Sequence, residues 1–136
     1  MIICSTPARS LTVPPGTVHD ISKQNGFCVD MHTKDATAAG ETADRLHLVA
    51  AWREATVFTD AERAALALAE VGTRLADTHQ GVSDETWAQA REHFDDDQLA
   101  ALIGQIALIN AANRMNVIVR NPAGSYRAGM FDAVTD

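Results

Sequence analysis

Two segments of the chain are apolar on most of their sides at helical spacing: AALALAEV at residues 64–71 and LAALIGQIALI at residues 99–109. A helix that is apolar all round is buried by the elements around it rather than lying on a surface. Aromatic residues make up only 5% of the chain, and the abundant alanines let neighbouring helices approach closely. These features predict an all-α protein, a small helical bundle with these two helices at its centre.

Start and stop signals divide the chain into five predicted helices. Asn25 opens the first helix, and Gly40, a residue type favoured just after a helix end, stops it. The sequence TDAE at residues 59–62 is a capping box, in which the threonine and the glutamate can satisfy each other's backbone amides. Ser83 caps a shorter helix, and Asp95 or Asp96 caps the longest one. The predicted helices span about residues 25–39, 41–53, 59–78, 83–94 and 98–117, with Leu46, Val49, Ala50 and Trp52 on the buried side of the second.

All five predicted helices belong to one domain, because 136 residues suffice for one core but hardly for two. Four proline and glycine residues within residues 1–18 leave no helical period there. We expect an extended or disordered arm at residues 1–18, the helical domain at residues 19–127 and a C-terminal tail at residues 128–136.

Charge and composition exclude several partners. The net charge of −7 and the lack of a basic run argue against nucleic acid. No apolar stretch approaches the roughly 20 residues needed to span a bilayer, so no membrane partner is expected. The first residues, MIICSTPARS, lack the long apolar core of a secretory signal, and two cysteines do not make a disulfide framework. We therefore expect a cytoplasmic protein.

Cys28 and His32 are the leading candidates for chemistry. If Asn25 or Gly26 caps the first helix, Cys28 lies in its first turn, near unpaired backbone amides and the positive end of the helix dipole. That environment favours the nucleophilic thiolate. His32 lies one turn further along the same face and can accept the thiol proton. The alternative is that Cys28 packs as a small apolar residue and His32 is a boundary residue.

Glu70 interrupts an apolar run and is expected to be at least partly buried. A buried carboxylate can serve as a proton relay, but Glu70 can equally form a salt bridge with Arg74, four residues on. Asn110, Asn113 and Arg114 form a polar patch on the longest predicted helix, which is more typical of an interface or a hydrogen-bond network than of a site. The histidines show no metal-ligand spacing, so neither a metal nor another cofactor is expected.

From about Ile21 to Arg127 the chain resembles the alkylhydroperoxidase D-like branch of the carboxymuconolactone decarboxylase superfamily. The resemblance is carried by DMHTKDA, AAWRE, TDAERAALALAE and, late in the chain, INAANR. It implies an all-α fold that assembles into homo-oligomers through helical faces. It also implies thiol-dependent reduction of a hydroperoxide substrate, with an external thiol or dithiol as reductant.

Members of that branch typically carry Cys-x-x-Cys-x-x-x-His, whereas this chain reads Asn-Gly-Phe-Cys at residues 25–28. Cys28 matches the second cysteine and His32 the motif histidine, while the first cysteine is missing. The preceding helix and its glutamate also have no counterpart before Asp20. Glu70 matches an acidic position of the branch, which favours a role in the site.

A lone thiolate can still attack a peroxide and become a sulfenic acid, but turnover then needs a resolving thiol. The candidates are Cys4 on the arm, Cys28 of another subunit and an external thiol. Two other functions remain open: an inactive oligomeric scaffold or binding protein that kept the fold, and the superfamily's lactone decarboxylase or isomerase chemistry, which uses general acids and bases and no thiol pair.

Overall fold

The computed structural model describes residues 25–75 and 79–131, and within these ranges the protein is helical with no strands. The predicted arm at residues 1–18, the absence of a helix before Asp20 and the position of Cys4 all lie outside the described residues. The helices are α2 (Gly26–Ala38), α3 (Ala43–Leu48), α4 (Asp60–Thr73), α5 (Asp84–His93) and α6 (Asp96–Ile118), with a 3₁₀ helix η1 (Val49–Ala51) after α3.

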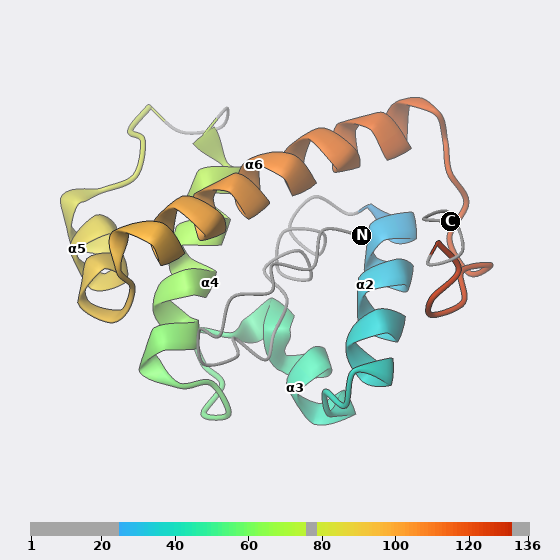
Figure 1. The fold of residues 1–136 in the computed structure, drawn as a ribbon, viewed down its shortest axis with the longest axis horizontal. Helices are drawn as coiled ribbons and strands as arrows, with labels where there is room; N and C mark the ends of the chain where they lie inside the picture. The colour runs from blue at the N-terminus through green and yellow to red at the C-terminus, as the bar shows by residue number, and fades with distance from the viewer. Residues whose placement is uncertain (1–24, 76–78, 132–136) are drawn as a thin grey trace.

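The longest helix, α6, crosses over the ends of α2 and α4, which lie at opposite sides of the view in Figure 1. α5 packs beside α4 and under the start of α6, while α3 lies at the far end of the molecule from α6 (Figure 1). This arrangement confirms the predicted all-α class. It also brings the first turn of α2 next to the second half of α6, where the candidate cysteine is found.

The predicted helix starts are confirmed by the caps. The side chain of Asn25 accepts from the backbone of Cys28 at the start of α2. Thr59 and Glu62 form the expected capping box at the start of α4, and Asp95 forms a second box with Gln98 at the start of α6. Each box satisfies two backbone amides that a helix terminus would otherwise leave without partners.

The helix predicted at residues 41–53 is broken: α3 ends at Leu48 and the chain continues as η1. In a 3₁₀ helix, residues three apart lie above one another. Val49 and Trp52 therefore face the core together, and both are buried. Ala50, predicted to be buried, is exposed, because the tighter winding turns it outwards.

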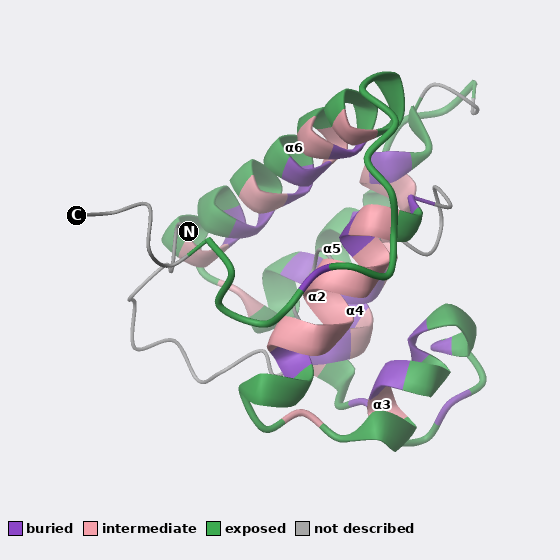
Figure 2. Ribbon diagram, turned by 90° about the vertical axis from the view of Figure 1, so that its right-hand side faces the viewer, coloured by how far each residue is buried: buried purple, intermediate pink, exposed green. Residues whose placement is uncertain are grey.

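The core has two parts, and α4 contributes to both. Leu66 packs with the first cluster, which comes from the chain between α3 and α4, whereas Leu68 packs with the second, between α4, α5 and α6. The predicted central position of α4 is therefore confirmed. α6 was also predicted to be buried at the centre, but only its inner edge is. Buried residues follow that edge, and exposed residues follow the outer edge (Figure 2). The first cluster is Val49, Trp52, Ala55, Phe58 and Leu66; the second is Ala65, Leu68, Ala69, Ala90, Leu99, Leu102 and Ile106.

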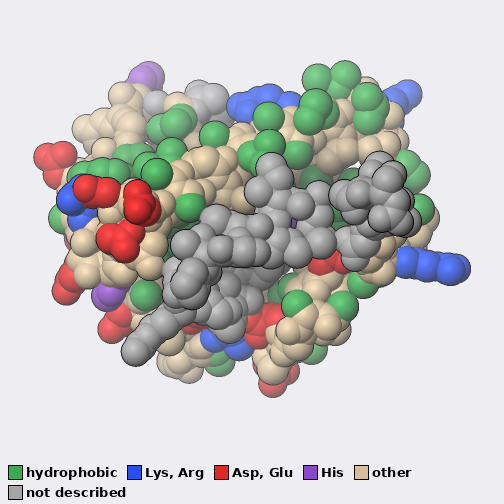
Figure 3. Space-filling model, viewed as in Figure 1, with side chains coloured by type: hydrophobic (Ala, Val, Ile, Leu, Met, Phe, Trp, Pro, Cys, Tyr) green, Lys and Arg blue, Asp and Glu red, His purple; other side chains and the backbone are tan. Residues whose placement is uncertain are grey.

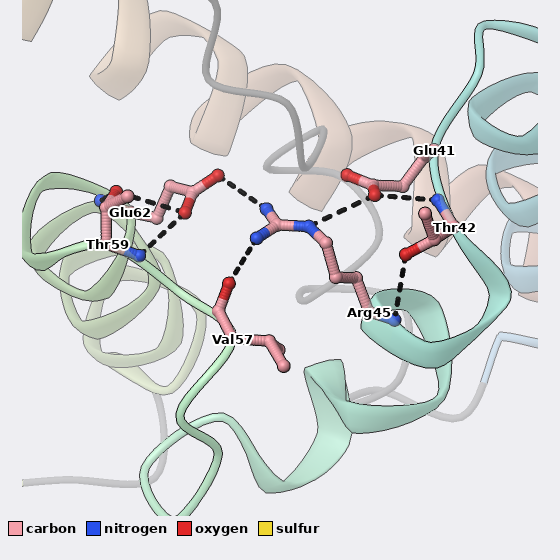
Figure 4. A network of polar contacts seen from close by, with 6 residues as sticks. All are labelled: Glu41, Thr42, Arg45, Val57, Thr59 and Glu62. Atoms are coloured by element: carbon pink, nitrogen blue, oxygen red, sulfur yellow. Dashed lines mark hydrogen bonds and ion pairs between the residues drawn. The ribbon is translucent and has the colours of Figure 1, made fainter.

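A polar network around Arg45 joins α3 to α4 (Figure 4). The guanidinium of Arg45 donates to Glu41, to the backbone carbonyl of Val57 and to Glu62. Glu62 is buried and also completes the capping box with Thr59, so one carboxylate serves both the ion pair and the helix start. The network fixes the loop between the two helices.

The chain after α6 folds back onto α2. The carboxylate of Asp30 accepts from the backbone amides of Gly124 and Tyr126, and the Tyr126 hydroxyl donates to Asp35 at 2.9 Å. Lys34 donates to the carbonyl of Tyr126 at 2.8 Å. The buried Tyr126 ring therefore holds the end of the chain against the helix that carries the candidate site.

Candidate active site at the start of α2

Asn25 places Cys28 in the first turn of α2. Its side-chain oxygen accepts the backbone amide of Cys28 at 3.3 Å, which is the cap that starts the helix. Both residues are buried, and the cysteine side chain has no exposed surface. The predicted position of Cys28 is therefore confirmed, but the sulfur is reached from solution only when the surrounding structure opens.

Two side-chain amides donate to the sulfur. The Nδ2 atom of Asn25 lies 3.3 Å from the Sγ atom of Cys28, and the Nδ2 atom of Asn116, on α6, lies 3.1 Å from it. Hydrogen bonds to an ionisable group favour its charged form when they are donated to it. Together with the helix dipole at this turn, the two amides favour negative charge on the sulfur.

Further hydrogen bonds set the orientation of both amides. Asn121 donates to the Oδ1 atom of Asn116 at 2.6 Å, which leaves the NH₂ group of Asn116 facing the sulfur. Asn25 donates from its own NH₂ group to the Oδ1 atom of the buried Asn113 at 2.8 Å. Because the oxygen of a carboxamide only accepts and its nitrogen only donates, each amide is held with its donor side towards Cys28.

His32 lies one turn after Cys28 on α2 and is partly buried. Burial lowers the pKa of His32 below its ordinary value of 6.5, and the nearby charge of Asp35 opposes that shift without cancelling it. The imidazole is therefore mainly neutral at pH 7 and able to take up a proton. Two of the hydrogen bonds to the sulfur come from asparagines, one from the helix cap and one from α6.

Glu70 lies on α4. Its Oε1 atom lies 3.2 Å from a guanidinium nitrogen of Arg74, so the salt bridge that was one of its two predicted roles is present. Its other oxygen accepts from the indole of Trp52 at 3.0 Å and from Arg53. Burial would raise the pKa of Glu70, but these hydrogen bonds and the two arginine charges outweigh it and hold the pKa below its ordinary value. Within the described ranges, no hydrogen bond joins Glu70 to Cys28 or His32, so its predicted role in the site stays a prediction.

Comparison with known proteins places these residues in a family. The profile of the "Carboxymuconolactone decarboxylase family" matches residues 20–71. The uncharacterized protein YdfG of Bacillus subtilis is 39% identical over 107 residues, which cover 77% of this chain and 71% of YdfG. The chain belongs to the carboxymuconolactone decarboxylase family. The uncharacterized protein YnjA of Escherichia coli is 34% identical over 97 residues, 71% of this chain and 52% of YnjA.

A solved structure assigns the chain to the alkylhydroperoxidase D-like branch of the carboxymuconolactone decarboxylase superfamily. It is that of ATU0492 from Agrobacterium tumefaciens, a protein of unknown function proposed to be the antioxidant defence protein AhpD. The two folds superpose with a TM-score of 0.81 and 29% sequence identity, over 90% of this chain and 82% of that one. The resemblance inferred from the sequence motifs is therefore confirmed for the fold and the family.

The family match contains Cys28, His32 and Glu70, whereas the asparagines of α6 lie beyond it. Sequence reasoning grouped Asn113 with a polar patch and did not consider Asn116. The available signal was the spacing of Asn113 and Asn116, which lie three residues apart and so on one side of a mainly apolar helix. Two amides on one side of a packed helix tend to meet polar groups of a neighbouring element, which here is the first turn of α2.

Proposed function

We propose that this chain reduces hydroperoxides with Cys28 as the nucleophile. The observation that carries the proposal is the pair of side-chain amides, from Asn25 and Asn116, that donate to the sulfur at the first turn of α2. A carboxamide NH₂ group has little reason to face a buried apolar thiol, but it stabilises a thiolate directly. The membership of the alkylhydroperoxidase D-like branch supports the same chemistry.

In the proposed reaction, neutral His32 takes the thiol proton and the thiolate attacks the terminal oxygen of the hydroperoxide. The O–O bond breaks, an S–O bond forms, and the alkoxide leaves as the alcohol after taking the proton from His32. Cys28 is then a sulfenic acid. An external thiol condenses with it to give water and a mixed disulfide, and a second thiol group releases Cys28 in its reduced form. A reducing compartment such as the cytoplasm supplies these thiols.

The proposal is tested by following consumption of an alkyl hydroperoxide in the presence of a dithiol. The wild type is compared with Cys28→Ser, and Cys4→Ser is the control for the other cysteine. We expect Cys28→Ser to remove the protein-dependent rate. Equal rates for wild type and Cys28→Ser would contradict the proposal, and a loss of rate in Cys4→Ser would identify Cys4 as the resolving thiol.

The complete burial of Cys28 favours a second candidate, a binding or scaffold protein without redox turnover. In that case the thiol would react no faster than an ordinary buried cysteine. The rate of alkylation of Cys28 at neutral pH, read by intact mass in a Cys4→Ser background, separates the two functions. Fast alkylation supports the peroxidase, and slow alkylation with no peroxide consumption supports the scaffold.

We also infer that the chain self-associates through the outer side of α6. Hydrophobic side chains gather along the upper edge of the molecule, over α6 (Figure 3). Met115 and Ile118 are 59% and 77% exposed, and Val117 and Val119 are exposed beside them. Contiguous exposed apolar surface is typical of a protein–protein interface. A second copy of the chain is the partner that the family resemblance implies.

A further inference from the structure

A groove between α4, α5 and α6 is separate from the Cys28 site. Its volume is about 420 Å³, within the range of small-molecule pockets. On α6 it is lined by Ile103, Ala107, Asn110 and Arg114, which recur every three or four residues and so form one stripe. From the helical repeat, this stripe lies about 120° around α6 from the asparagines that face Cys28. The two sites therefore use different sides of the same helix.

The walls of the groove are mainly apolar. Leu68 and Ile106 belong to the buried core between the helices, while Leu75, Trp87 and Ile103 are partly or largely exposed along its sides. Gly72 lets α4 approach α6 closely, because a Cβ atom there would lie 3.2 Å from Cγ2 of Ile106. The groove therefore offers a continuous apolar lining with one side open to solvent.

Thr73 brings one polar group into this lining. Its side chain is 2% exposed, and in the described part of the chain its hydroxyl has no hydrogen-bond partner. Buried hydroxyl groups normally have a partner, because leaving one unpaired is costly. A ligand oxygen entering the groove would supply the missing partner.

Arg114 brings a positive charge to the same end. Its guanidinium donates to the backbone carbonyl of Asn110 at 3.2 Å, so the side chain folds back along α6 towards Ile106 and the end of α4. Within the described ranges Arg114 pairs with no carboxylate, although the chain carries a net charge of −7. Arg45, Arg53, Arg74 and Arg91, in contrast, each form an ion pair.

We propose that this groove binds an amphipathic carboxylic acid of medium chain length. The carboxylate lies between the Arg114 guanidinium and the Thr73 hydroxyl, and the hydrocarbon chain extends along the apolar wall towards Trp87. Arginine and a hydroxyl together satisfy both oxygens of a carboxylate. The apolar walls shield the alkyl chain from water. This ligand complements the charge, the unpaired hydroxyl and the lining at once.

The probe is decanoate, titrated below its micelle concentration into the full chain and followed by calorimetry and by tryptophan fluorescence. We expect saturable binding with one site per chain and a change in fluorescence from Trp87, which lines the groove. Decanol, which has the same tail and no charge, should bind much more weakly. Cys28→Ser should bind decanoate like the wild type, so a failure of the proposed peroxidase function leaves this test intact.

Variants identify the groove as the site. Arg114→Gln should weaken decanoate binding about tenfold, as expected for the loss of one charge-assisted hydrogen bond, and Thr73→Val should weaken it severalfold. Arg127→Gln, at another exposed arginine, is the matched control. Ala107→Leu should fill the groove and reduce binding, whereas Ala101→Leu, at an exposed alanine of α6 outside the groove, should not.

Three results would overturn the proposal. The first is no decanoate binding at millimolar concentration by a chain whose circular dichroism shows it folded. The second is an equal effect of Arg114→Gln and Arg127→Gln on affinity. The third is protection of Trp87 that depends on protein concentration and not on decanoate, because the groove would then be covered by a second copy of the chain.

Discussion

The sulfur of Cys28 accepts hydrogen bonds from two side-chain amides that come from distant parts of the sequence. One is the cap residue of its own helix, Asn25, and the other is Asn116 from the far end of the chain. Asn25 also accepts the backbone amide of Cys28, so a single side chain starts the helix and donates to the sulfur. The reactivity of Cys28 should therefore respond to changes in residues that never contact the substrate.

Replacing Asn116 with aspartate keeps the size of the side chain but removes the donor and adds negative charge next to the sulfur. We expect alkylation of Cys28 to slow about tenfold or more, because the thiolate loses one hydrogen bond and gains a repulsive neighbour. The measurement is the rate of iodoacetamide labelling at pH 7 in a Cys4→Ser background. Asn110→Asp is the control, since Asn110 donates to the carbonyl of Ile106 and not to the sulfur. Equal slowing in both variants would contradict the assigned contact.

His32 should give the folded state a characteristic pH dependence. Burial lowers its pKa below 6.5, so the unfolded chain binds a proton to this side chain at a higher pH than the folded chain does. The contribution of the neutral imidazole is fully present above pH 6.5 and is lost as the pH falls from 6.5 towards the folded pKa. Chemical denaturation at several pH values should show a steeper loss for wild type than for His32→Gln over this range. If the free energy of unfolding fell equally with pH in both proteins, the lowered pKa of His32 would be contradicted.

At the level of helices, the charge of Glu70 joins α4 to the turn that follows η1. The carboxylate accepts from Trp52 and Arg53 and pairs with Arg74. Its lowered pKa shows that the folded state favours the charged form, so this stabilisation is present near neutral pH and is lost at acid pH below its ordinary value of 4.5. The contacts of Glu70 indicate a structural role.

Glu70→Gln tests that role against the predicted part in catalysis. We expect the free energy of unfolding to fall by about 1 kcal/mol, because the glutamine keeps one acceptor oxygen but loses the two ion pairs, whose arginines are half exposed. The rate of peroxide consumption should be unchanged at a temperature where both proteins are folded. A lower rate of peroxide consumption by folded Glu70→Gln would instead support the predicted catalytic role of Glu70.

Helix starts could be predicted from the sequence because the signals are local. The Thr59 and Asp95 caps depend only on residues three positions apart, and both starts are confirmed. The break after Leu48 could not be predicted from local signals. It depends on the tertiary packing of Trp52 against Phe58 and Leu66. The same holds for the site: the first turn of α2 reveals Cys28, but only the fold brings Asn116 to it.

At the level of the whole molecule, the apolar outer side of α6 should govern self-association. Ile118→Glu would place a charge on the most exposed of its large apolar residues, and we expect the proposed oligomer to dissociate to smaller species. Sedimentation velocity at several protein concentrations measures this change. Ala88→Glu, at an exposed position of α5, is the control and should sediment like the wild type. A wild type that is monomeric at all concentrations would contradict the inferred interface.

Cys28 and Asn116 stand 88 positions apart in the sequence, yet their side chains meet. The electrostatic surroundings of the sulfur therefore exist only while the first and last described helices remain together. Partial unfolding by heat or denaturant would expose the thiol and at the same time remove the amides that favour its thiolate form. The alkylation rate of a thiol exposed in this way should therefore fall to that of an ordinary cysteine, which distinguishes opened copies of the chain from intact ones.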